Sequence, residues 1–258
     1  MNPRIKKSIG IIGCGRFGAL LSEMLSEEFE VSVYDVKPDP YLTHINFTDL
    51  ESVLQLSTIF IAVPIHHFKN TIIEIASKLI KKTTVIDVCS VKCYPVEIMQ
   101  AHLPPSVGII ATHPLFGPDS LQKAQLKMMM HPARDTHDCY EFWKNYFSSK
   151  KIKILEMTPD QHDRFAARSQ SITHFIGRTL EVMGSQSTEM DTIGYKNLLA
   201  VMAHTCNDKW DLFLDLQRFN PYAAQTIGEF IEKSIHLQKE ITKLSPFPDA
   251  SREQAKER

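Results

Sequence analysis

IGIIGCGRFGALL, residues 9–21, joins an apolar run to the start of a helix through three glycines. The run 9–13 is predicted to be a buried strand, and the segment after it has helical spacing. The first glycine permits a tight turn, the second lets a pyrophosphate approach the helix N-terminus, and the third lets the helix pack on the sheet. The alternative is a chance glycine-rich turn. The stretch predicts an α/β fold with a dinucleotide-binding loop of Gly13, Gly15, Arg16, Phe17 and Gly18.

The second apolar run, VSVYD (31–35), ends in a carboxylate 17 residues after Gly18. A carboxylate at this position accepts hydrogen bonds from the ribose 2′-hydroxyl of NAD and repels the 2′-phosphate of NADP. Lys37 lies close enough along the chain to soften that repulsion. Asp35 therefore predicts NAD as the preferred cofactor, with NADP possible.

Further apolar runs follow at intervals filled by helical segments. The first five runs of the chain are rich in Ile and Val and continuous rather than alternating, which is typical of parallel strands covered by helices on both faces. The first half, 1–157, is therefore predicted to be a Rossmann-type doubly wound sheet. Its expected later strands are IFIAVP (59–64), TVIDV (84–88), GIIAT (108–112), MMMHP (128–132) and IKILEM (152–157).

The period changes to helical from Thr158. TPDQ (158–161) predicts a helix start with a capping box, and Asn220-Pro221 predicts the start of the last helix. We expect an all-helical domain over 158–244 and a disordered tail over 245–258. Its helices are expected over 163–183, 194–206, 209–219 and 221–243.

The ends of the predicted strands carry Val63-Pro64, Ser90 and His113. Ligands of such sheets bind at the carboxyl ends of the strands, so these residues are expected near the nicotinamide. The rigid THPLFGP loop (112–118) would then fix the His113 ring; capping of the strand is the alternative. His66 and His67 are interpreted as residues of a loop or helix start without an orienting partner.

The net charge of −1 does not favour nucleic acid or an anionic membrane as a partner. No apolar run approaches the roughly 18 residues of a membrane span, and neither a signal peptide nor a transit sequence is expected. Five cysteines without a CxxC pair predict reduced thiols in a cytoplasm. His131, His137 and Cys139 lack a fourth ligand at zinc-like spacing, so no metal is expected.

Five blocks resemble the prephenate/arogenate dehydrogenase family of tyrosine biosynthesis, most closely its plant-type arogenate dehydrogenases. The resemblance spans about residues 8–240, although Asp35 departs from the NADP preference common among plant members. It implies a Rossmann domain, a helical domain that forms a homodimer, and NAD(P)-dependent oxidative decarboxylation of arogenate or prephenate, with arogenate favoured. The blocks are VIDVCSVK (85–92), ATHPLFGPDS (111–120), QHDRFAARSQSITHFIGRTLE (161–181), STEMDTIGYKNLL (187–199) and NDKWDLFLDLQRFNPYA (207–223).

The resemblance also implies roles for individual residues. His113 matches the catalytic histidine of the family and Ser90 its supporting serine. Gln170 and His174 match residues of the substrate pocket and, four apart, share a helix face. A surface glutamine and a core histidine are the structural alternatives.

Two substrate contacts stay open. Lys196 stands where bacterial members carry an arginine for the ring carboxylate, and Arg178 is a second candidate. Asp208 matches an acidic residue that pairs with the ammonium of arogenate, which prephenate replaces by a ketone. It could also cap a helix that starts at Lys209.

Two other functions fit parts of the sequence. In a β-hydroxyacid dehydrogenase Lys196 would be the catalytic lysine, but the THPLFGP block argues against that class. A non-catalytic NAD-binding regulator would need the glycine loop and Asp35, with no reason for Ser90 and His113 at adjacent strand ends.

Overall fold

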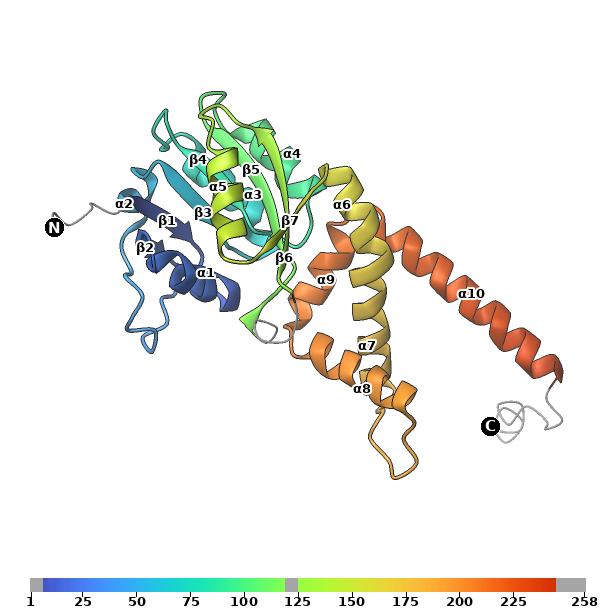
Figure 1. The fold of residues 1–258 in the computed structure, drawn as a ribbon. Coiled ribbons are helices and arrows are strands. Elements are labelled where there is room, and N and C mark those ends of the chain that lie inside the picture. The colour runs from blue at the N-terminus through green and yellow to red at the C-terminus, as the bar shows by residue number, and fades with distance from the viewer. Residues whose placement is uncertain (1–6, 119–124, 245–258) are drawn as a thin grey trace. The chain divides into compact units, whose positions relative to one another are not determined.

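The computed structural model describes residues 7–118 and 125–244 (Figure 1). The chain divides into two compact units. The sheet unit comprises Met1–Ala166 and Lys209–Pro221, and the helical unit comprises Ala167–Asp208 and Tyr222–Arg258.

The sheet unit is built on one seven-stranded sheet in the order β2-β1-β3-β4-β5-β6-β7. The first five strands are parallel, β6 is antiparallel to β5, and β7 is parallel to β6. This confirms the predicted Rossmann-type α/β fold and all seven predicted strands. The strands are β1 Ser8–Ile12, β2 Glu30–Tyr34, β3 Thr58–Ile61, β4 Thr84–Asp87, β5 Gly108–Pro114, β6 Lys127–Arg134 and β7 Lys153–Glu156.

Helices cover both faces of the sheet, as the continuous apolar strands require. One face packs against α2 (Leu50–Leu54), α3 (Ile65–Ala76) and α4 (Cys93–His102). The other packs against α1 (Arg16–Ser26) and α5 (Tyr140–Ser149). Adjacent strand residues divide between the two cores: Ile109 joins the first and Ile110 the second.

The strand order reverses beside β1, since β2 lies on one side of it and β3 on the other. Ligands of open α/β sheets bind at such a switch point, at the carboxyl ends of the strands. The glycine loop that follows β1 therefore lies at the position where this fold binds nucleotides.

The helical unit contains a π-helical turn, η2 (Ala167–Ser171), followed by α7 (Ile172–Val182), α8 (Ile193–Cys206) and α10 (Ala223–Leu244). α7 and α8 approach closely at Gly177, where a Cβ atom would lie 2.0 Å from Thr205 Oγ1. No helix in 7–118 or 125–244 is long and apolar enough to cross a membrane.

Two helix starts differ in outcome. The capping box is confirmed, because Thr158 and Gln161 exchange backbone-to-side-chain hydrogen bonds before α6 (Pro159–Ala166). The predicted start of the last helix at Pro221 is wrong: α10 begins at Ala223, and the Asn220 amide donates to the Asp163 carbonyl.

The observed units do not follow the expected boundary at residue 157. Helix α6 packs on α4, and α9 (Trp210–Arg218) packs on α3, so both belong to the sheet unit. Helical periodicity alone cannot show which unit a helix joins. The expected tail, 245–258, lies outside the described residues.

Candidate active site

The glycine loop has the geometry that a dinucleotide requires. Gly13 adopts φ +100°, and a Cβ there would lie 2.6 Å from the Ala62 carbonyl oxygen. At Gly18 a Cβ would lie 2.2 Å from the Gly13 carbonyl oxygen. A Cβ at Gly15 would meet no atom within 4 Å, and no side chain caps α1 there. The loop therefore presents open space at a helix N-terminus, which suits a pyrophosphate.

Asp35 directly follows β2 and contacts the same loop. Its carboxylate accepts hydrogen bonds from the backbone amides of Cys14 (2.6 Å) and Lys37 (2.8 Å). The side chain therefore lies beside the glycine loop, where the fold places the adenosine ribose. These features fit a dinucleotide.

The connection after β3 lies against the glycine loop. Val63 and Pro64 form this connection, and Pro64 is the N-cap of α3. A Cβ at Gly13 would lie 2.9 Å from the Val63 amide nitrogen. Ser90, after β4, is half-buried, and its hydroxyl makes no hydrogen bond within the described part of the chain.

His113 lies near the end of β5 and is 3% exposed. The loop after it packs back on the glycine helix, because the Phe116 ring contacts the Phe17 ring edge-on at 6.1 Å between centroids. The strand thus delivers a buried imidazole to the carboxyl edge of the sheet, and the loop ties that edge to the first turn of α1.

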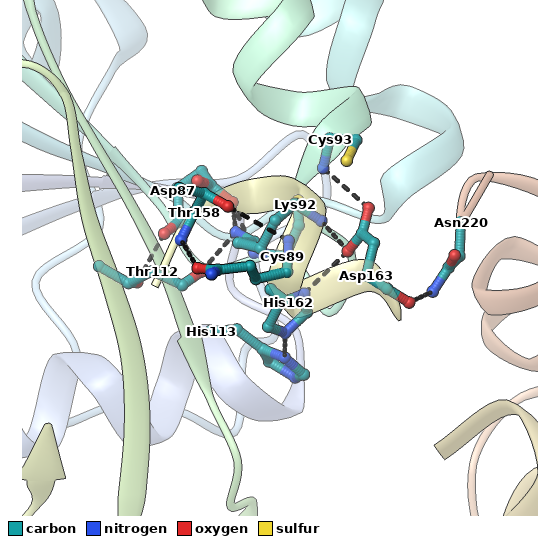
Figure 2. A network of polar contacts seen from close by, with 11 residues as sticks. Asp87, Cys89, Lys92, Cys93, Thr112, His113, Thr158, His162, Asp163 and Asn220 are labelled. Carbon is teal, nitrogen blue, oxygen red and sulfur yellow. Dashed lines mark hydrogen bonds and ion pairs between the residues drawn. The ribbon is translucent and has the colours of Figure 1, made fainter. Parts of the chain in front are cut away.

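His113 belongs to a buried polar network that the sequence analysis missed (Figure 2). Its Nδ1 lies 2.7 Å from Nε2 of His162, whose Nδ1 lies 2.8 Å from Oδ1 of Asp163. Asp163 also accepts hydrogen bonds from the backbone amides of Lys92 and Cys93, both at 2.8 Å. Helix α6 therefore supplies His162, which contacts His113, and Asp163, which holds His162.

A buried ion pair holds the backbone beside His113. The Lys92 ammonium contacts the Asp87 carboxylate and the Thr112 carbonyl, and Lys92 and Asp87 are fully buried. The Thr112 hydroxyl donates to the Asp87 carbonyl at 2.6 Å. Burial raises the pKa of Asp87, and the Lys92 ammonium offsets part of that rise. A buried charge needs such a partner.

These surroundings keep His113 uncharged. Burial, together with the His162 ring and the Lys92 ammonium, lowers the pKa of His113 well below 6.5. A neutral imidazole can accept a proton at neutral pH. Within the described residues its Nε2 atom has no hydrogen-bond partner, so this nitrogen is the one available to a ligand.

The expectation that His66 lacks an orienting partner is wrong. His66 lies in the first turn of α3, and its Nδ1 lies 2.6 Å from Asp215 of α9. Asp215 also accepts a hydrogen bond from the His66 amide. The pair is 149 residues apart in sequence, so no local pattern could reveal it.

The helical unit brings together several predicted substrate residues. Gln170 lies in the π turn and His174 in α7; their atoms Oε1 and Nδ1 are buried without a partner among the described residues. Burial lowers the pKa of His174, and the nearby Asp208 carboxylate opposes this. The capping alternative for Asp208 is wrong, because Lys209 is the N-cap of α9.

The two candidate cations differ in their surroundings. Arg178 is 8% exposed, donates to Glu181 at 2.9 Å and to the Asp208 carbonyl at 2.5 Å. Lys196 is exposed on α8, and its charge adds to the lowering of the Asp191 pKa that the hydrogen bond from Ser187 mainly causes. Of the two candidates, Arg178 therefore contacts the Asp208 and His174 cluster, while Lys196 lies at the surface.

Comparisons with known proteins agree with this architecture. Residues 42–129 match the nucleotide-binding domain of prephenate dehydrogenase, and residues 179–245 match a TYRAAT1-like C-terminal domain. The fold is similar to the crystal structure of prephenate dehydrogenase from A. aeolicus in complex with hydroxyphenyl propionate and NAD⁺. The TM-score is 0.70 at 17% identity, over 91% of this chain and 90% of the other.

Two curated relatives come from Arabidopsis thaliana. Arogenate dehydrogenase 1, chloroplastic, is 30% identical over 247 residues, which cover 89% of this chain and 38% of the relative. Arogenate dehydrogenase 2, chloroplastic, is 34% identical over 171 residues, 64% of this chain and 48% of the relative. The chain thus spans less than half the length of either one. On these matches, the chain belongs to the prephenate/arogenate dehydrogenase family.

Proposed function

We propose that the chain catalyses NAD-dependent oxidative decarboxylation of arogenate to tyrosine, with prephenate as the alternative substrate. The observation that carries the proposal is the position of His113. Its buried, neutral imidazole lies at the carboxyl edge of the sheet, and the glycine loop lies at the same edge. A regulator that only binds NAD has no need of such a base.

In this reaction His113 Nε2 accepts the proton of the ring hydroxyl. NAD, which the glycine loop and Asp35 would hold, would take up the hydride that leaves the carbon of this hydroxyl. The ketone so formed is conjugated to the carbon bearing the carboxylate, so carbon dioxide leaves and the ring becomes aromatic. Ser90 is proposed to hydrogen-bond the hydroxyl or the imidazole, and its free hydroxyl is available for either role.

Gln170, His174 and Asp208 are proposed to bind the substrate. A buried polar atom without a hydrogen bond costs about 1–3 kcal/mol, so the lone Gln170 Oε1 and His174 Nδ1 support a site for a polar ligand. Asp208 near His174 would pair with the ammonium of arogenate. Arg178 or Lys196 is proposed for the ring carboxylate.

A homodimer through the helical unit is proposed from α10. This helix exposes a row of large apolar side chains, which soluble monomers seldom leave in contact with water. They include Phe230, Ile231, Ile235, Leu237 and Ile241.

All five cysteines of the chain are free thiols. They fit a reducing compartment, and the cytoplasmic location stays a prediction.

Replacing His113 by Asn should lower kcat by roughly 10²–10⁴-fold, the usual contribution of a general base, without weakening NAD binding. The same change at exposed His102 should leave kcat unaltered.

For the unchanged protein, kcat/KM should hold steady down to pH 6.5 and fall only at lower pH, because protonation of His113 removes the base. Steady-state kinetics across pH checks both points, and near-normal kcat in His113→Asn would reject the assignment.

Replacing Asp35 by Ser should shift the NADP-to-NAD ratio of kcat/KM upward by about tenfold or more. Like charges a few ångströms apart near a protein surface repel by on the order of 1–4 kcal/mol, and the change removes one of them. Asp39→Ser, which removes a nearby exposed carboxylate, serves as the control. An equal shift in both variants, or in neither, would mean that Asp35 does not contact the ribose.

Replacing Asp208 by Asn should reduce kcat/KM for arogenate by roughly ten- to a hundredfold, because the charge-assisted hydrogen bond to the ammonium is lost. Activity with prephenate should rise, since the amide can donate to the ketone. Asp211→Asn, three residues along and exposed, is the matched control. A substrate ratio that does not move in Asp208→Asn would refute the specificity role while leaving the dehydrogenase proposal intact.

The dimer predicts a molar mass of twice the 29.4 kDa chain in light scattering at micromolar concentration. Ile235→Glu together with Ile231→Glu should shift the protein toward monomer, because charges replace the apolar row. A monomeric mass for the unchanged protein would contradict the proposal.

A further inference from the structure

The hydrogen bond between the His113 and His162 rings raises the question of which nitrogen carries the hydrogen. Two imidazole nitrogens 2.7 Å apart form a hydrogen bond only if one is protonated and the other offers a lone pair. The answer decides the tautomer of His113, and with it which of its nitrogens can act as a base.

Asp163 resolves the question. Its carboxylate is fully buried, and each of its oxygens accepts a hydrogen bond from a backbone amide, Oδ1 from Lys92 and Oδ2 from Cys93. Because both oxygens act as acceptors, the His162 nitrogen that lies 2.8 Å from Oδ1, Nδ1, carries the hydrogen of that bond. In a neutral His162 ring the other nitrogen, Nε2, is then an acceptor, and the hydrogen between the two rings belongs to His113.

We propose that His162, held by Asp163, is a positioning residue that fixes His113 in the Nδ1–H tautomer and so presents the Nε2 lone pair to the substrate. The assignment of the tautomer stands on the hydrogen-bond geometry together with a neutral His162 ring. Its consequence for turnover rests on the proposed dehydrogenase function. If His162 instead carried both hydrogens, it would donate to His113, and the hydrogen of His113 would lie on Nε2.

A histidine in this place does what a carboxylate does in serine hydrolases, where loss of the tautomer control costs about 10⁴-fold in kcat. His162 sets the tautomer without placing a negative charge in direct contact with His113. A carboxylate bonded directly to His113 would favour the imidazolium. With His162 between them, Asp163 sets the tautomer, and the imidazole remains neutral and able to accept a proton.

The test is made on His162 rather than Asp163, because Asp163 also caps the start of α4 and binds Asn220. His162→Ala removes the acceptor. His162→Gln keeps one, since its amide oxygen can accept from His113 Nδ1. His137→Ala, which removes a half-buried histidine bonded to the Ser106 carbonyl, is the control.

The direct readout is the tautomer. Long-range ¹H–¹⁵N spectra of ¹⁵N-histidine-labelled protein at about pH 8 distinguish protonated from lone-pair ring nitrogens, and the His113 signals are those missing from His113→Asn. We expect Nδ1–H in the unchanged protein, in His162→Gln and in His137→Ala, and a shift to Nε2–H in His162→Ala. An Nε2–H tautomer in the unchanged protein overturns the proposal, and this measurement needs neither activity nor a folded His162 variant.

The second readout is the split between kcat and KM. His162→Ala should lower kcat by roughly 10- to 100-fold with little change in KM, and His162→Gln should recover most of it. A loss confined to KM, or equal losses in Ala and Gln variants that bind NAD normally, would contradict a positioning role. If the unchanged protein oxidises neither arogenate nor prephenate, the proposed function fails while the tautomer result still stands.

Discussion

The Asp163 carboxylate forms the junction on which the geometry of the candidate site depends. It accepts hydrogen bonds from the first amides of α4 and from the His162 ring, and its own carbonyl accepts one from Asn220. Hydrogen bonds to a buried charged group contribute about 1.5–3 kcal/mol each. One side chain thus joins α6 to the β4–α4 connection, and through His162 it sets the direction of His113.

Local pattern was enough to predict the sheet, the glycine loop and the position of His113. The continuous Ile- and Val-rich runs each became a strand, because short β-branched runs suit parallel strands that are covered by helices on both faces. The turn at Gly13 followed from spacing, since φ +100° is open to glycine at little cost. Thr158 and Gln161 form the expected capping box, which is itself a local device.

The rest of the site depends on contacts that no local pattern contains. His113 and His162 are 49 residues apart, and the HD dipeptide that supplies the partner differs little from an ordinary solvated helix start. Asp215 meets His66 only because α9 returns to the sheet unit. The reading of Asp208 as a cap failed for a smaller reason: α9 begins one residue later than the segment was expected to start, so Lys209 takes that position.

The neutral network has a consequence for the energetics of proton transfer. Burial makes His113 a weaker base than a histidine in water, which by itself would slow the proposed reaction. When a proton arrives at Nε2, the ring becomes cationic, and its Nδ1–H bond to His162 becomes charge-assisted and therefore stronger. The Asp163 carboxylate behind His162 adds to this stabilisation. In the proposed reaction this gain would appear only as charge develops on His113, so the network would stabilise the transition state more than the resting enzyme, which is the condition for catalysis.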